Sequence, residues 1–131
     1  MANEAVCIEL PRVIKRIYVS DLVAIPLGTI LKLSGDNTGI ASSGADVFCG
    51  ITIEEKTASD GIVEIGAAVD GVWDLKDAGA GITAGGIVSL NGANLIKQAT
   101  EAEMVTGVAF GKALETAGAA DVIRVKVGSF A

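Results

Sequence analysis

Val122-Ile-Arg-Val-Lys-Val127 carries the clearest secondary-structure signal in the chain. Apolar residues at 123, 125 and 127 alternate with Arg124 and Lys126, and strict alternation of this kind is typical of a β-strand with one buried face. The stretches 47–53 and 61–69 are also rich in β-branched residues, which favour strands. The sequence therefore predicts an all-β protein.

Composition supports this fold class and narrows the function. The chain has 131 residues, 17 of them Gly, against an ordinary usage of ~7%, so its length predicts one domain and its glycines predict many turns. It contains no His, the commonest general base and metal ligand. A formal net charge of −6 disfavours binding to a phosphate backbone, and no apolar stretch approaches the ~18 residues of a membrane span. We expect neither nucleic acid nor a membrane as a partner.

Short motifs predict how the strands connect. Asp60-Gly61, Asp70-Gly71 and Asn91-Gly92 supply the positive φ angles that two-residue hairpin turns need, which favours a meander of antiparallel strands. Thr100-Glu-Ala-Glu103 matches a capping box, but Gly107 follows within about two turns. The predicted fold is an antiparallel β-sandwich or a β-tulip-like small barrel with an extended N-terminal arm and at most one short helix.

The first 25 residues are the source of the predicted arm. Pro11 and Pro26 enclose a β-branched run that cannot easily continue as a helix past either proline. Basic residues outnumber acidic ones over residues 1–20, whereas acidic residues dominate the remainder. Two interpretations follow: an extended arm over 1–25 attached to a single β domain over 26–131, or a first strand of the main sheet.

A weak internal repeat is visible in the sequence. Gly50-Ile-Thr-Ile53 aligns with Gly107-Val-Ala-Phe110, and Ile62-Val-Glu-Ile65 aligns with Val122-Ile-Arg-Val125. Each copy predicts a strand, a connection and a second strand, so duplicated hairpins are one hypothesis, with a chance match between Gly-rich and β-branched segments as the alternative.

No complete catalytic or cofactor motif is present. Gly107-Val-Ala-Phe-Gly-Lys-Ala113 has three residues between its glycines where a phosphate loop needs four, and Ala where that loop needs Ser or Thr. Asp70, Asp74 and Asp77 flank a predicted turn, as is typical of a solvated rim, and Cys49 lies in a predicted buried strand. The sequence predicts a non-enzymatic protein with no catalytic residue, metal site or cofactor.

Lys56 supports a rival hypothesis. It lies between acidic and small residues where two predicted strands meet, and lipoyl and biotinyl carrier domains present a modified lysine on such a hairpin. The tight tip of those domains, Asp-Lys-Ala or Met-Lys-Met, is missing here. A carrier domain modified at Lys56 is the alternative function.

Two further stretches carry a resemblance to a known family. The first runs from Gly66-Ala-Ala-Val-Asp-Gly-Val-Trp-Asp-Leu75 to Ile82-Thr-Ala-Gly-Gly-Ile-Val-Ser-Leu90. The second runs from Met104-Val-Thr-Gly-Val-Ala-Phe-Gly-Lys-Ala-Leu-Glu115 to the strand ending at Val127. Together they resemble the small all-β capsid decoration (cement, or head-stabilising) proteins of bacteriophages.

The resemblance implies a structural protein that binds the major capsid protein of the expanded head and clamps neighbouring subunits against internal pressure. It also implies a homotrimer on the outer capsid surface of the virion, made in the host cytoplasm. Two Cys and no signal-like start agree with a reduced compartment. We expect the arm to bind the capsid by adding a strand to a sheet edge, through Arg12, Val13, Ile14, Lys15, Arg16, Ile17, Tyr18 and Val19.

Overall fold

The computed structural model describes residues 3–128. Its regular secondary structure is almost entirely β-strand, so the protein is all-β, as predicted. The strands are β1 (Val6–Glu9), β2 (Ile14–Tyr18), β3 (Ile30–Gly35), β4 (Thr38–Ala41), β5 (Phe48–Thr52), β6 (Glu64–Ala68), β7 (Gly71–Asp77), β8 (Ile87–Leu90), β9 (Leu95–Gln98), β10 (Gly111–Ala113) and β11 (Val122–Val127). The helix found in this range is α1 (Glu101–Val105).

Two local predictions are confirmed in detail. Thr100 Oγ1 accepts a hydrogen bond from the N–H of Glu103 (3.3 Å), and Glu103 Oε1 accepts one from the N–H of Thr100 (2.9 Å), which forms the predicted capping box of α1. In β11, residues 123, 125 and 127 are buried and Arg124 is exposed. Both features depend on neighbours close in sequence, which is why the sequence predicts them well.

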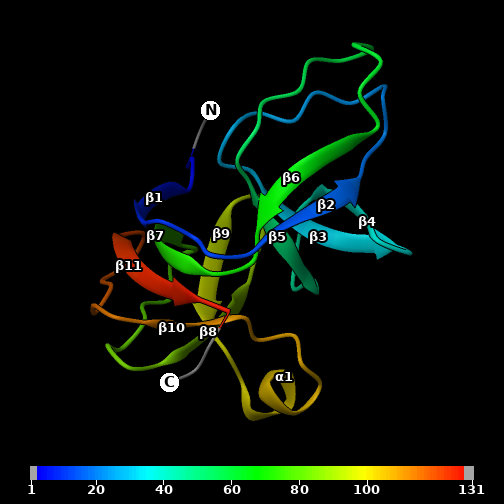
Figure 1. Cartoon of the computed structure of the whole chain (residues 1–131). Coiled ribbons are helices and arrows are strands. Elements are labelled where there is room, and N and C mark those ends of the chain that lie inside the picture. The colour runs from blue at the N-terminus through cyan, green and yellow to red at the C-terminus, as the bar shows by residue number, and fades with distance from the viewer. Residues whose placement is uncertain (1–2, 129–131) are drawn as a thin grey trace.

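The strands form two small closed barrels that lie side by side (Figure 1). The first has the strand order β2-β4-β3-β5-β6 and is closed by the antiparallel pairing of β6 with β2. The second consists of β7, β11, β10, β8 and β9, closed by the pairing of β7 with β9, while β1 pairs with β7 outside that ring. The small-barrel form of the predicted fold is therefore correct, and it occurs twice.

The prediction that all strands form an antiparallel meander is wrong for one pairing in each barrel. β2 pairs with β4 and β7 pairs with β9 in parallel, and these pairings bring strands together that are not consecutive in sequence. Asn91-Gly92 does lie between the antiparallel neighbours β8 and β9. Asp70-Gly71 instead leads from β6 of the first barrel to β7 of the second.

The two barrels share one pairing pattern. In each, the first strand is parallel to the third and antiparallel to the fifth, and the second strand is antiparallel to the third and fourth. Backbone conformations repeat as well: φ is 78° at Gly28 and 86° at Gly85, and 50° at Asn37 and 57° at Asn94. The structure therefore supports the hypothesis of an internal duplication.

The repeat is out of register with the alignment proposed from sequence. Gly50 of β5 pairs with Leu31 of β3, and in the second barrel Gly111 of β10 pairs with Val88 of β8. The counterpart of Gly50 is thus Gly111 rather than Gly107. The connections that contain α1 and the loop before β5 differ in length, which displaces the sequence match.

Residues 6–18, which we call the strap, run along both barrels. β1 pairs with β7 and β2 with β6, so the strap is antiparallel to residues 64–74, which pass from the first barrel to the second. Where the strap crosses between barrels, Asp70 Oδ1 accepts hydrogen bonds from the N–H groups of Arg12 (2.9 Å) and Val13 (3.1 Å). Ile17 is buried in the first barrel. The extended-arm interpretation is wrong for β2, which is a first strand of the fold.

The apolar core is continuous across the junction of the barrels. The larger buried cluster combines residues of β7–β11 with Ile30, Ile51 and Ala68 of the first barrel. The smaller cluster fills the rest of the first barrel and includes Cys49, which is buried as predicted. Phe48 and Phe110 stack with ring centroids 4.4 Å apart. The predicted division into an arm and a single β domain is therefore replaced by two barrels packed as one body and joined by the strap.

Asn94 is the main polar connection between the barrels. Its buried side chain belongs to the β8–β9 turn of the second barrel, yet its Oδ1 accepts the N–H of Ile30 (2.9 Å) and its Nδ2 donates to Gly28 O (2.8 Å) and to Asn3 O (3.1 Å). Its own N–H donates to Ser42 Oγ (3.2 Å). One amide thus joins the second barrel to backbone groups of the first, and it is the acceptor for the buried N–H of Ile30.

We predict that Asn94→Ala lowers the free energy of unfolding by about 3 kcal/mol, because it removes the acceptor of the buried Ile30 N–H and the two hydrogen bonds that the amide donates to Gly28 O and Asn3 O. Asn37→Ala is the matched control. Asn37 holds the same turn position at a positive φ, but its side chain donates to Arg16 O at an exposed site (3.0 Å), so a loss of about 1 kcal/mol is expected. Urea unfolding measures both; equal losses would contradict the junction role.

A truncation tests the strap. Removal of residues 1–18 takes away β1 and β2, opens the first barrel and exposes Ile65 and Ala67, which are fully buried beside β2. We expect the shortened chain to lose cooperative unfolding, followed by near-UV circular dichroism during heating. A truncated chain that melts cooperatively near the temperature of the full chain would show that β2 is dispensable.

Candidate functional site

The strap carries most of the binding residues predicted from sequence. Arg12, Val13, Ile14, Lys15, Arg16 and Tyr18 are exposed, whereas Ile17 and Val19 are buried in the first barrel and face no partner. The structure thus brings six of these eight residues to the surface and assigns the other two to the core. The prediction assigned all eight residues to binding because it treated the segment as a free arm, in which neither face is buried by the rest of the chain.

Apolar side chains extend the exposed surface of the strap to the second barrel. We call this set the strap surface, and its apolar members are Val6, Ile8, Leu10, Val13, Ile14 and Tyr18. Leu10, in the crossing between the barrels, is 86% exposed. Exposed apolar side chains are ordinary when single, but a run of them along one segment is typical of a surface that a partner covers.

Charges flank the strap surface. Arg16 forms ion pairs with Glu54 (3.0 Å) and Glu64 (3.4 Å), and its Nη2 also donates to Glu64 O (3.2 Å). These side chains are about half exposed, so the pairs orient the guanidinium and add little to stability. Arg16 is thus compensated by two carboxylates of its own chain, whereas Arg12 and Lys15 are exposed and are the basic residues of the strap that an acidic partner would meet.

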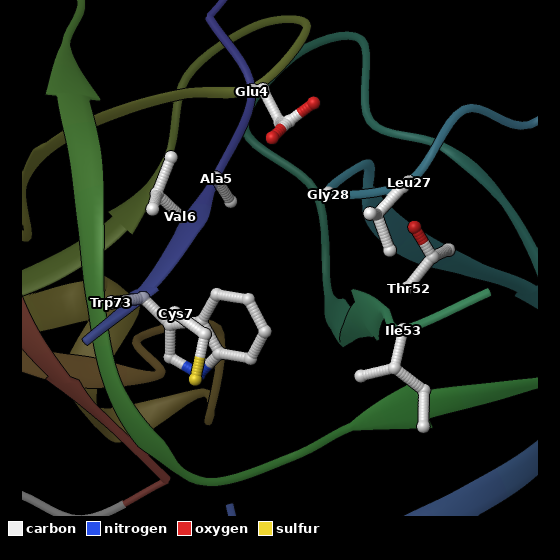
Figure 2. A pocket seen from close by; sticks show the side chains of 9 residues that line it. All are labelled: Glu4, Ala5, Val6, Cys7, Leu27, Gly28, Thr52, Ile53 and Trp73. Atoms are coloured by element: carbon white, nitrogen blue, oxygen red, sulfur yellow. The ribbon is translucent and has the colours of Figure 1, made fainter. Parts of the chain in front are cut away.

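A recess lies beside the strap in the seam between the barrels (Figure 2). Its volume is about 270 Å³. Figure 2 shows Ala5, Cys7 and Trp73 on the side of the second barrel, opposite Leu27, Thr52 and Ile53 of the first. Glu4, Val6 and Gly28 complete the lining. Most of these groups are apolar, so the recess has room for an apolar side chain of a partner.

The indole N–H of this recess is already engaged, and its thiol is unreactive. Trp73 Nε1 donates to Asp70 O (2.9 Å), which leaves the indole ring as an apolar wall. The Cys7 thiol donates weakly to Glu9 O (3.4 Å), and partial burial raises its pKa, which disfavours the thiolate form of a nucleophile. The recess is suited to contact rather than to chemistry.

Lys56 does not have the geometry of a carrier lysine. Its side chain is fully buried, and its ammonium donates to Asp21 O (2.7 Å) and Thr57 O (3.0 Å) and pairs with Asp60 Oδ1 (3.1 Å). A lysine that receives a lipoyl or biotinyl group must project into solvent to reach its ligase. The alternative of modification at Lys56 is therefore not carried further.

This buried ammonium is the site feature that sequence reasoning missed. The only signal in sequence was an Asp four residues after Lys56, followed by Gly61, which does not distinguish a surface turn from a closed cage. In the described part of the chain, no three His, Cys, Asp or Glu side chains are grouped so as to hold a metal ion. Residues 3–128 also contain no helix with the length and apolar character needed to cross a bilayer.

Comparison with known proteins adds no relative. No protein-family model matches the chain, and no curated protein matches it. The functional argument therefore depends on the strap surface and the recess beside it.

Acid pH should weaken the Lys56 cage. Burial opposes ionisation of Asp60, but hydrogen bonds from the N–H of Ile62, from Lys56 and from the N–H of Thr57 outweigh it, so the pKa of Asp60 is lowered. A lowered folded-state pKa gives stability that is complete above the ordinary Asp pKa of ~3.9 and is lost as the pH falls through the folded-state value.

We therefore predict that Asp60→Asn destabilises the protein at pH 7 and shrinks the difference in unfolding free energy between pH 7 and pH 3. Glu55→Gln, an exposed substitution in the same loop, is the control and should leave that difference unchanged. Urea titrations at the two pH values provide the measurement. Parallel pH dependence in wild type and Asp60→Asn would contradict the role of the cage.

Proposed function

We propose that this chain is a non-enzymatic capsid decoration protein of a bacteriophage, which binds the major capsid protein of the expanded head from outside. The observation that carries the proposal is the strap surface: exposed apolar side chains follow one another along a segment that is hydrogen-bonded to both barrels. The resemblance of residues 66–90 and 104–127 to cement proteins indicates which partner that surface meets.

The strap gives this binding a mechanical rationale. A force applied to the strap surface passes through backbone ladders into β6 and β7, and hence into both barrels, rather than into a flexible tail. The recess beside Trp73 adds room for one anchoring side chain of the shell. A protein that binds only the expanded shell stabilises that shell by mass action, without any chemical step.

In this proposal the protein acts at the virion surface after synthesis in the host cytoplasm, and three copies contact one another on the shell. Met104 and Val105 of α1 are also exposed and are distant in sequence from the strap. Such apolar residues outside the strap surface provide contact area between copies.

The proposal is tested by mixing the purified protein with expanded empty heads assembled from the major capsid protein of the same genome. We expect co-sedimentation and a higher melting temperature of the heads. The double variant Ile14→Ser with Tyr18→Ser should weaken binding at least tenfold, because burial of two partly exposed apolar side chains contributes about 2 kcal/mol or more.

Leu114→Ser with Val122→Ser is the matched control, since it removes apolar groups of similar exposure from the second barrel. It should leave the affinity of a single copy for the shell unchanged. Failure of the wild type to bind expanded heads overturns the proposed function. Binding that is lost in the control but kept in the strap variant would place the docking surface elsewhere. Electron microscopy of decorated heads that shows isolated copies would refute the trimer.

A further inference from the structure

The two barrels have equivalent positions for Lys56 and Ala117. Ile25 and Lys56 exchange two backbone hydrogen bonds of 2.9 Å, and Ile82 and Ala117 exchange two of 3.1 and 2.8 Å. Ala117 is buried like Lys56. The second barrel therefore has a methyl group where the first has a buried ammonium.

The loop after this position is also repeated. Asp60 Oδ2 accepts the N–H of Thr57 (3.0 Å), and Asp121 Oδ2 accepts the N–H of Gly118 (2.9 Å). In the first barrel, Thr57 O and Asp60 Oδ1 are two of the acceptors that hold the ammonium. The second barrel has the counterparts of these acceptors, Gly118 O and Asp121 Oδ1, but no ammonium at the equivalent position.

The second barrel also has a buried carboxylate, Asp77, near this loop. The N–H of Val19, just after β2, donates to Val63 O (2.9 Å), and the N–H of Asp77, at the end of β7, donates to Asp121 O (2.9 Å). Asp77 thus occupies the position of an apolar residue, and it is completely buried. The expectation that Asp77 belongs to a solvated rim is wrong.

One oxygen of Asp77 has no hydrogen-bond partner within residues 3–128. Oδ2 accepts the N–H of Gly81 (2.9 Å) and of Ala120 (3.3 Å), whereas no donor among the described residues reaches the buried Oδ1. In the first barrel the N–H equivalent to that of Ala120, from Ser59, donates to Asp21 O, which also accepts the Lys56 ammonium (both 2.7 Å). The Asp77 carboxylate therefore borders the position that the ammonium occupies in the other barrel.

We propose that this end of the second barrel binds a hard divalent cation of the Ca²⁺ class, which takes the place of the lysine ammonium. Asp77 Oδ1, the Asp121 carboxylate and Gly118 O would supply oxygen ligands, and because Asp121 is an exposed residue, water would complete the coordination shell. A buried carboxylate oxygen without a partner destabilises the folded state, and a bound cation would remove that energetic penalty. This inference is independent of the proposed function.

The test is thermal unfolding of the full chain after treatment with EDTA, with CaCl₂ or MgCl₂ added and choline chloride used to keep the ionic strength constant. We expect either divalent salt to raise the melting temperature by roughly 4–6 °C for each tenfold increase above its dissociation constant. Asp77→Asn should abolish the rise, because the amide removes the charge that the cation neutralises.

Ala117→Lys supplies the ammonium from the chain, as Lys56 does in the first barrel. It should melt higher than wild type without divalent cations and should no longer respond to them. Glu55→Gln, an exposed change in the first barrel, should respond as wild type does. The proposal is overturned if wild type gains no more from CaCl₂ or MgCl₂ than from choline chloride, or if Asp77→Asn gains as much as wild type.

Discussion

The hydrogen bonds of Asn94 set the relative placement of the two barrels. Two small barrels that merely touched through apolar groups would be free to slide, because apolar contact is not directional. Asn94 removes that freedom by joining the β8–β9 turn to the backbone of Ile30 and Gly28 inside the junction. A buried amide tolerates little displacement before its partners become unsatisfied, so this side chain, together with the hydrogen bond from Ser42 Oγ to Gly92 O (2.9 Å), holds the seam in which the recess lies.

The strap depends on that placement. Its two strands pair with β7 and β6 in different barrels, so both ladders form together only when the barrels have one relative position. Gly28 shows how tight the fit is: a Cβ built there would lie 2.6 Å from Ala5 O, whereas one at its counterpart Gly85 would meet no atom within 4 Å. Position 28 therefore requires glycine for two reasons: its positive φ and the close approach of Ala5, which immediately precedes the strap.

The sequence predicts what neighbouring residues determine and misses what distant ones determine. Alternation gives β11, and the capping box gives α1, since each is settled within a few residues. The parallel pairings of β2 with β4 and of β7 with β9 join strands that have another strand between them in sequence, and no local signal encodes them. The strap is the intermediate case: its β character and exposed residues are predicted, but the burial of Ile17 depends on a partner strand far along the chain. The burial of Lys56 likewise cannot be predicted from its neighbours in sequence, because it depends on an acceptor at Asp21.

The hypothesis of an internal duplication accounts for two such different sites at equivalent positions. Once a barrel is copied, each copy keeps the backbone geometry of its end loop but is free to satisfy that loop with different chemistry. The first barrel closes its cage with Lys56, whereas the second carries Asp77, whose buried Oδ1 has no partner among the described residues. Asp77 is the last residue of β7, and β7 is also the strand to which β1 of the strap is paired. A cation that neutralised Asp77 would therefore stabilise the strand to which the strap is paired, so β7 links the two halves of the molecule as Asn94 does.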